Sequence, residues 1–160
     1  MEKMEQLLNQ WDFNLDKEDW YPPLGEVLKG VTEEQADWKP AGAAANTIRE
    51  TVRHLLFYKE RLLYRLTGEE TEYPSGITNE DTFFKDHGGE LSWGELAEKL
   101  FAVHRKLRDE LAKLMEADYE KPLGSGQVGS WATSLVLHDA YHTGQIVLLR
   151  KLQGSWPARR

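Results

Sequence analysis

The chain has 160 residues, 29% of them charged, and a formal net charge of −7 at pH 7. This length is typical of one ordinary domain with a substantial core, and the charged fraction is that of a globular protein. The negative charge argues against a nucleic-acid partner, because non-specific binding relies on lysine and arginine to neutralise phosphates.

Features that the sequence lacks narrow the class of protein further. No apolar run approaches the ~18 residues that a membrane span needs, and the polar N-terminus does not favour a signal peptide. The chain contains no cysteine, which excludes disulfides, thiolate metal sites and cysteine nucleophiles. Any metal must therefore be held by nitrogen and oxygen. We expect a cytoplasmic protein with no membrane partner.

The dominant apolar period is helical and predicts four long segments. The first runs from Glu2 to Gly30 and is interrupted at Pro22 and Pro23, because proline removes a backbone donor and clashes with the preceding turn. A short helical turn is expected directly afterwards, over residues 32–35.

The second and third helices have clear start signals. Thr47 followed by Glu50 fits a capping box, and Gly68 is a plausible C-cap for the second helix. The third begins with the same pattern at Ser92 and is expected to run to about Glu116.

The fourth helix is expected to begin near Ser130 and to end at Gly154. A glycine-rich segment that we expect to be flexible, residues 124–129, precedes it. The long polar connection over residues 69–91 would cross the end of the bundle, and such connections are often functional. Without internal repeats or a domain boundary, the sequence predicts an all-α four-helix bundle with a long connection between helices 2 and 3, as a single domain over residues 1–160.

Two histidines, His138 and His142, stand four residues apart inside the apolar fourth segment. In a helix they share one face, and other members of that face should be buried. Those members are Trp131, Leu135, Leu149 and Leu152. Charging an imidazole in a core costs several kcal/mol, whereas a bound metal satisfies neutral imidazoles well. The pair is therefore either a metal site or two packed structural histidines.

The pair does not form the zinc-protease motif, in which a glutamate directly follows the first histidine and acts as the base. Asp139 holds that position here. Its shorter carboxylate, rotated by about 100° from His138, is a doubtful substitute.

A third ligand would come from His54, His87 or His104. His54 belongs to a polar stripe that suits the wall of a cleft or a solvated helix face. The stripe consists of Thr47, Thr51, His54, Tyr58, Arg61 and Arg65. His104 lies on a core stripe, where a hydrogen-bonded structural histidine is common, and His87 lies in an expected loop. Spacing alone does not decide between His54 and His104.

Three segments resemble the DinB superfamily, which includes thiol-dependent S-transferases related to bacillithiol transferase and mycothiol-dependent maleylpyruvate isomerase. They are Trp38-Lys39-Pro40, Asn46-Thr47-Ile48 leading into Val52-Arg53-His54-Leu55, and above all His138-Asp139-Ala140-Tyr141-His142-Thr143-Gly144-Gln145-Ile146. The resemblance extends over essentially the whole chain.

This resemblance implies a DinB-type four-helix bundle with a divalent metal held by one histidine of the second helix and two of the last. Carried onto this chain, the ligands are His54, His138 and His142. Nickel or zinc is the usual metal in the family, with iron and manganese as further candidates. The resemblance also implies a low-molecular-weight thiol as cosubstrate, and it does not imply DNA chemistry.

Three side chains near these ligands are candidate catalytic residues. Tyr58, one turn from His54, could donate a hydrogen bond to a metal-bound ligand or pack at the edge of the core. Gln145 shares a face with His142 and could hold it in place. Asp139 could orient a ligand imidazole from an adjacent helix, or lie exposed.

The leading hypothesis is a metal-dependent thiol S-transferase that acts on a small electrophilic molecule. Arg61 and Arg65 could bind the carboxylates of the thiol, or could face solvent. The first rival is a metal-dependent hydrolase with Glu50 as base, although a capping role suits Glu50 better. The second rival is a metal-binding, stress-associated bundle without turnover. Apolar helix faces suit a homodimer in each case.

Overall fold

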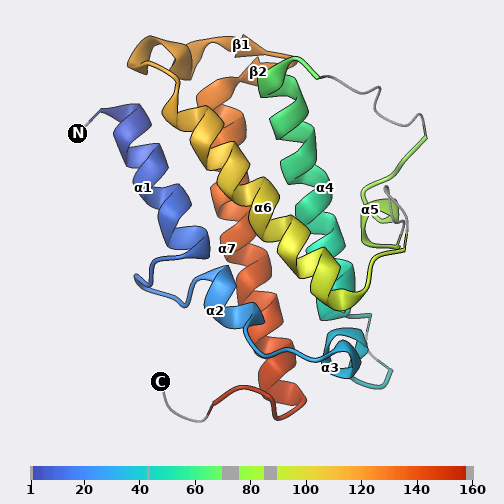
Figure 1. The fold of residues 1–160 in the computed structure, drawn as a ribbon. Helices are drawn as coiled ribbons and strands as arrows, with labels where there is room; N and C mark the ends of the chain where they lie inside the picture. The colour runs from blue at the N-terminus through green and yellow to red at the C-terminus, as the bar shows by residue number, and fades with distance from the viewer. Residues whose placement is uncertain (1, 43, 70–75, 85–89, 158–160) are drawn as a thin grey trace.

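The computed structural model of the chain describes residues 2–42, 44–69, 76–84 and 90–157. In this part of the chain, four long helices pack side by side as a bundle (Figure 1). They are α1 (Lys3–Leu15), α4 (Ile48–Thr67), α6 (Trp93–Ala112) and α7 (Val128–Leu152). The predicted all-α four-helix bundle is thereby confirmed. No described helix combines the length and apolar character needed to cross a membrane.

Short elements join the long helices. Within the described residues, three of these elements are α-helices, one is a 3-10 helix, and two strands form an antiparallel hairpin in which Pro122 pairs with Gln127. They are α2 (Leu24–Leu28), α3 (Glu33–Asp37), α5 (Asp81–Phe84), η1 (Glu116–Glu120), β1 (Pro122–Leu123) and β2 (Gly126–Gln127).

Both predicted capping boxes are confirmed. The Thr47 hydroxyl accepts a hydrogen bond from the Glu50 backbone N–H at 3.1 Å, and the Glu50 carboxylate accepts one from the Thr47 N–H at 2.7 Å. Ser92 forms the same reciprocal pair at the start of α6. Gly68 ends α4 with a φ of 72°, a left-handed conformation that glycine adopts without steric cost.

The N-terminal segment differs from the prediction, because α1 ends at Leu15, well before the prolines. The polar run over residues 16–19 offers no apolar side chain to the bundle. Leu15 and Leu24 are both buried in the same core cluster, so the chain must turn between them. A Cβ on Gly25 would lie 2.7 Å from the Leu15 carbonyl oxygen, and glycine therefore permits this turn to close tightly.

The connection between α6 and α7 also differs from the prediction. Helix α6 ends at Ala112 rather than near Glu116. Residues 124–127 of the glycine-rich segment form the turn and second strand of the hairpin, and residues 128 and 129 begin α7. The Trp131 indole N–H donates to the Leu123 carbonyl at 2.9 Å. A Cβ on Gly126 would lie 2.9 Å from that indole nitrogen, so the hairpin approaches Trp131 closely only because glycine stands there.

The expected buried face of α7 is partly correct. Leu135 and Leu149 are buried and Trp131 is half-buried, but Leu152 is exposed. Leu152 follows Leu149 by three positions, and this step places Leu152 about 60° around the helix from Leu149, toward solvent.

Candidate metal centre

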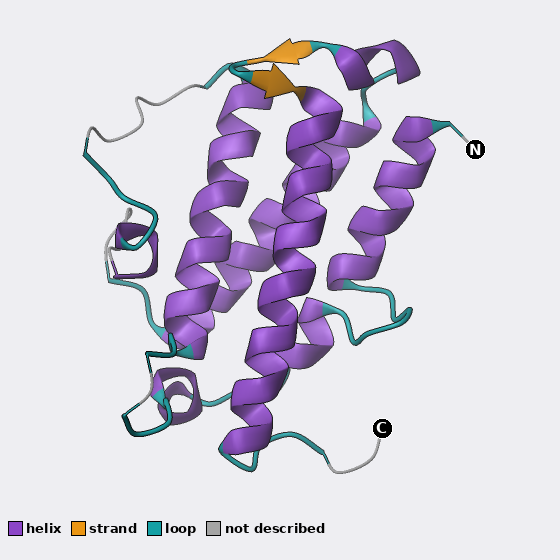
Figure 2. Ribbon diagram, turned by 180° about the vertical axis from the view of Figure 1, so that it is seen from behind, coloured by secondary structure: helices purple, strands orange, loops and turns teal. Residues whose placement is uncertain are grey.

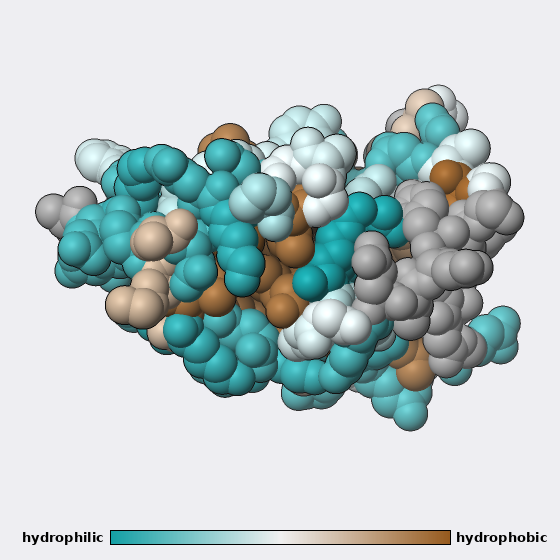
Figure 3. Space-filling view, turned by 90° about the horizontal axis from the view of Figure 1, so that it is seen from above, coloured by the Kyte–Doolittle hydropathy of each residue, from teal (hydrophilic) through white to brown (hydrophobic). Residues whose placement is uncertain are grey.

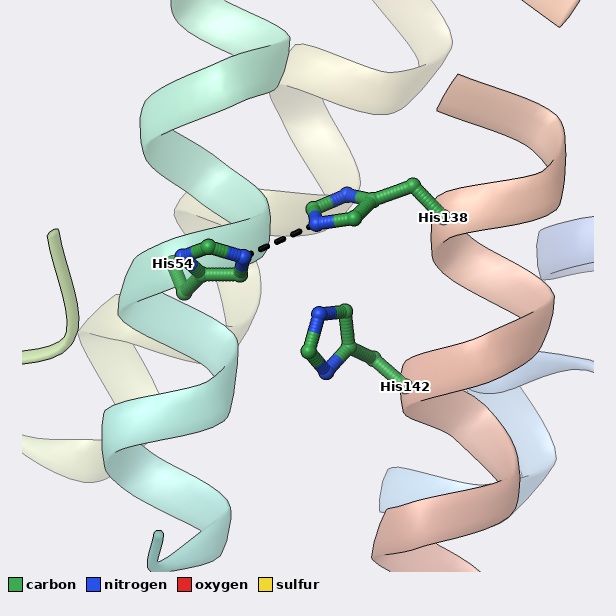
Figure 4. A group of neighbouring side chains, drawn as sticks. All are labelled: His54, His138 and His142. Carbon is green, nitrogen blue, oxygen red and sulfur yellow. Dashed lines mark hydrogen bonds between the residues drawn. The ribbon is translucent and has the colours of Figure 1, made fainter. Parts of the chain in front are cut away.

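Three histidines from two helices point toward a common space between α4 and α7 (Figure 4). His54 comes from α4, and His138 and His142 come from successive turns of α7. One ring nitrogen from each histidine can be chosen so that all lie within 4.8 Å of one another. Nε2 of His54 and Nε2 of His138 lie 2.8 Å apart.

The other histidines lie elsewhere or outside the described residues. His104 is buried in the core, where its ring packs on Trp11 at a centroid distance of 4.9 Å and its Nε2 lies 3.3 Å from the Trp11 carbonyl oxygen. That is the structural histidine expected on a core stripe. His54 is also buried, so its stripe is not a solvated face at that point. His87 lies outside the described residues.

The outer ring nitrogens of two histidines have partners that determine their tautomers. The Thr82 hydroxyl donates to the Asn79 carbonyl at 2.6 Å, so at 2.6 Å from His54 Nδ1 it accepts a hydrogen bond from that nitrogen. The side-chain oxygen of Gln145 can only accept, and it lies 2.7 Å from Nδ1 of His142. Both rings therefore carry their proton on Nδ1 and keep a free lone pair on Nε2.

His138 differs from His54 and His142 in the hydrogen bonding of its ring. Its Nδ1 is buried and has no hydrogen-bond partner within the described part of the chain. Because His54 Nε2 presents a lone pair, the two rings satisfy each other only if His138 donates from its own Nε2. A divalent ion would accept lone pairs from all three rings, and three neutral imidazoles suit zinc or nickel and leave a coordination position open. The donor set therefore fits such an ion.

Burial keeps these imidazoles neutral at pH 7. It lowers the pKa of His54 to about 3, with a further contribution from His138 and His142. Burial also lowers the pKa of His138 to about 4 and brings the pKa of His142 below its ordinary value. Metal ligation requires the neutral form, so protons compete weakly with a metal for these nitrogens.

The comparison with protein families bears on the same residues. The sequence profile of the DinB superfamily matches residues 24–146, well over half of the chain. The chain belongs to the DinB superfamily. A search of curated proteins found no significant match. Membership in this superfamily and the three-histidine group together support a metal-binding DinB-like protein.

Two cavities meet the histidines of this DinB-superfamily protein. The larger, about 530 Å³, extends from His138 past Tyr58 to Arg61, Arg65 and Trp131. The smaller, about 380 Å³, lies beside all three histidines, and its other walls are Asn46, Asn79, Phe83, Tyr141 and Gln145. Seen from the hairpin end, apolar side chains are visible at the centre, ringed by hydrophilic ones (Figure 3). The polar stripe of α4 thus forms a cavity wall, one of its two predicted roles.

Tyr58 and Gln145 both lie beside the candidate ligands. The Tyr58 ring meets those of His54 and His138 edge-on, at centroid distances of 5.0 and 5.4 Å, and its hydroxyl donates to Asn79 at 2.8 Å. Gln145 contacts His142 directly. Their geometry suits the predicted roles.

Asp139 is not exposed, so that alternative is wrong. Its carboxylate is buried and forms an ion pair with Lys59, which is itself fully buried. The same carboxylate lies 3.8 Å from Nδ1 of His104. Burial raises the pKa of Asp139, and the Lys59 ammonium opposes that rise. Asp139 is therefore linked to Lys59 and to the core residue His104.

Sequence reasoning did not find Thr82, Asn79 or Lys59. Thr82 and Asn79 belong to the long connection between α4 and α6, and the length of that connection was the available signal. Lys59 could have been noticed because it stands between Leu55 and Leu62 on the core stripe of α4, where a charge requires a partner.

The metal-free protein is expected to lose stability as the pH falls below 6.5, the ordinary pKa of histidine. Burial lowers the pKa of His54, His104, His138 and His142, to about 3 for His54 and about 4 for His138. Between pH 6.5 and about 4 the unfolded state therefore binds more protons, and unfolding free energy falls by about 1.4 kcal/mol per pH unit for each proton of difference.

Urea unfolding at pH 7.5, 6.5 and 5.5 in the presence of chelator measures this loss. His104→Gln should reduce the slope by one proton, because it removes one buried imidazole outside the candidate metal centre. Equal stability at the three pH values would contradict the burial of these neutral rings.

Proposed function

We propose that this DinB-superfamily protein holds a divalent metal through His54, His138 and His142 and transfers a low-molecular-weight thiol to a small electrophile. The observation that carries the proposal is the convergence of three neutral imidazoles at the end of a cavity that contains arginine. When bound, a divalent ion lowers the pKa of a thiol and so supplies a nucleophile at neutral pH. Because the chain has no cysteine, the thiol comes from a cosubstrate.

Arg65 is suited to bind an anionic group of that thiol. Its guanidinium carbon lies over the Trp131 ring, 5.2 Å from the ring centroid, and a Cβ on Gly124 would lie 3.6 Å from the guanidinium. The planar guanidinium carries several N–H donors, which match the geometry of a carboxylate. Arg61 lines the same cavity one turn earlier.

Tyr58 and Asn79 occupy the end of this cavity that is next to His138. The Tyr58 hydroxyl, which donates to Asn79, can instead donate to a bound thiol or electrophile and orient it. The smaller cavity, with Tyr141 and Gln145 in its wall, provides space for a small uncharged electrophile on the other side of His138.

The geometry favours a transferase over the hydrolase. A hydrolase of this type needs a carboxylate that takes a proton from water. The Glu50 carboxylate accepts the Thr47 N–H of the capping box, and the Asp139 carboxylate is paired with Lys59. Both carboxylates are thus engaged elsewhere.

The test uses metal-free protein reconstituted with zinc or nickel, mercaptosuccinate as the thiol probe and monochlorobimane as the electrophile. The proposal expects conjugation that requires both metal and protein. Ester hydrolysis without thiol would favour the hydrolase, and stoichiometric metal binding without either reaction would favour the non-catalytic bundle.

Arg65→Met is expected to raise the KM for mercaptosuccinate by about 10- to 100-fold with little change in kcat, because it removes one charge-assisted hydrogen bond to substrate. The KM for uncharged 2-mercaptoethanol should not change. Arg108→Met, which removes an arginine paired with Asp12 on another face, is the matched control. An equal effect on both thiols would mean that Arg65 acts on the fold rather than on the thiol.

A further inference from the structure

Exposed large apolar side chains are concentrated on α7. Four of the seven found among the described residues lie on this helix, and each is between 56% and 66% exposed. We call them the outer stripe: Leu137, Tyr141, Leu148 and Leu152. Helical geometry places them within a sector about 60° wide on the side opposite the core. Figure 2 shows α7 in front along its length, with no described helix covering it.

The spacing of the outer stripe is symmetric. Its steps of four, seven and four residues have their midpoint between Gly144 and Gln145. If two copies of α7 pair antiparallel about a twofold axis at that midpoint, Leu137 lies opposite Leu152 and Tyr141 lies opposite Leu148. An isologous interface requires this kind of self-complementarity.

Gly144, at the midpoint, has no evident role within one chain. Glycine destabilises a helix interior relative to alanine. A Cβ on Gly144 would meet nothing within 4 Å, so packing inside the chain does not demand glycine there. Glycine does allow a second backbone to approach closely, and on this face that backbone would belong to another molecule.

The electrostatics of the face favour a second copy. The chain carries a net charge of −7, so copies repel one another over most of their surface. Between Val128 and Leu149, Asp139 carries the only formal charge at pH 7, and it is buried against Lys59. Two copies can therefore meet along this length without bringing like charges together.

The apolar area is adequate for the centre of an interface. Four half- to two-thirds-exposed side chains present several hundred Å² together, a size that marks interaction sites on monomers and supplies the core of an interface of about 800 Å² per partner.

We propose that a second copy of this chain covers the outer stripe, with the two α7 helices antiparallel about an axis between Gly144 and Gln145. The pairing also bears on the histidine group. Tyr141 and Gln145 line the smaller cavity, so Leu148 of the second copy lies at the edge of that cavity. The dimer thus closes one side of the site, and this inference does not depend on any activity.

Sedimentation equilibrium of the full chain over a range of concentrations is the first test. The wild type should be a dimer, and Leu137→Glu and Leu148→Glu should each weaken it by roughly 100-fold or more, because a glutamate would be buried without a partner. Met115→Glu, at an exposed apolar residue outside the stripe, is the control. Circular dichroism shows whether each variant is folded.

Three other outcomes would overturn the proposal. A wild type that stays monomeric at all concentrations would overturn the proposal, and so would a dimer that survives both stripe variants. A monomer that binds phospholipid vesicles or an apolar peptide through the stripe would assign the face to another partner and would overturn it as well.

Cross-linking tests the antiparallel arrangement. Because the chain contains no cysteine, an introduced cysteine is the only thiol of its chain that can react. With a short bis-maleimide, Leu137→Cys should cross-link to Leu152→Cys in a mixture, and Gly144→Cys should cross-link to itself. Leu137→Cys alone should not, because its two copies lie about 22 Å apart along the helices. Efficient self-cross-linking of Leu137→Cys would overturn the proposed pairing.

Discussion

His142→Ala is expected to abolish stoichiometric binding of a divalent metal. The side chain supplies one of three nitrogens, and its Nε2 lone pair is free because Gln145 holds the proton on Nδ1. Zinc sites built by four ligands bind with about 10–16 kcal/mol, so the loss of one ligand should weaken binding by at least about 100-fold. Elemental analysis after loading with zinc or nickel and dialysis against metal-free buffer measures the bound fraction.

His104→Gln is the matched control, because it removes a histidine that is equally buried but contacts Trp11 instead of the group. It should retain one equivalent of metal. Full retention by His142→Ala would show that the assignment of the site is wrong, and loss of metal from His104→Gln would show that the third ligand is wrong. Thermal unfolding of the metal-free variants separates loss of the site from loss of the fold.

The parts of the fold that were predictable are those with local causes. The starts of α4 and α6 follow from side-chain hydrogen bonds spanning three residues, at Thr47 and Ser92. The end of α1 was not predictable from its own period, because it depends on Leu24 and Gly25 packing against Leu15. The hairpin before α7 likewise depends on a contact with Trp131.

In the candidate site too, some features follow from local sequence and others depend on contacts between distant residues. Helical spacing alone predicted that His138 and His142 share a face. Helical spacing could not identify the third histidine. His104 is excluded by its contact in the core with Trp11, which is 93 residues away in the chain. Resemblance to the DinB superfamily supplied His54, and the structure brings all three together.

The ion pair between Lys59 and Asp139 joins α4 to α7 within the core, next to the candidate ligands. Lys59 follows His54 by five residues, and Asp139 directly follows His138. Both charged groups are buried, and the Lys59 ammonium also lies 5.1 Å from the centroid of the Trp11 ring. The pair therefore helps to determine how far apart the two histidine-bearing helices lie.

Asp139→Asn is expected to destabilise the metal-free protein by about 3–5 kcal/mol, because it leaves the buried Lys59 ammonium without a counter-charge. Lys59→Met should cost less. Burial already raises the pKa of Asp139, so without the ammonium its carboxyl can take up a proton and become neutral. Urea unfolding in the presence of chelator measures both, since bound metal would add its own stabilisation.

The double variant Lys59→Met, Asp139→Leu distinguishes a strong pair from two independent polar residues. Because it buries no charge, it should be more stable than Asp139→Asn alone, as is found when buried ion pairs are replaced by apolar residues of similar size. If the costs of Lys59→Met and Asp139→Leu, each measured alone, add up to the cost of the double variant, the coupling would be contradicted. A stable double variant that still loses metal would show that the pair serves mainly to position His54 against His138 and His142, rather than to hold the bundle together.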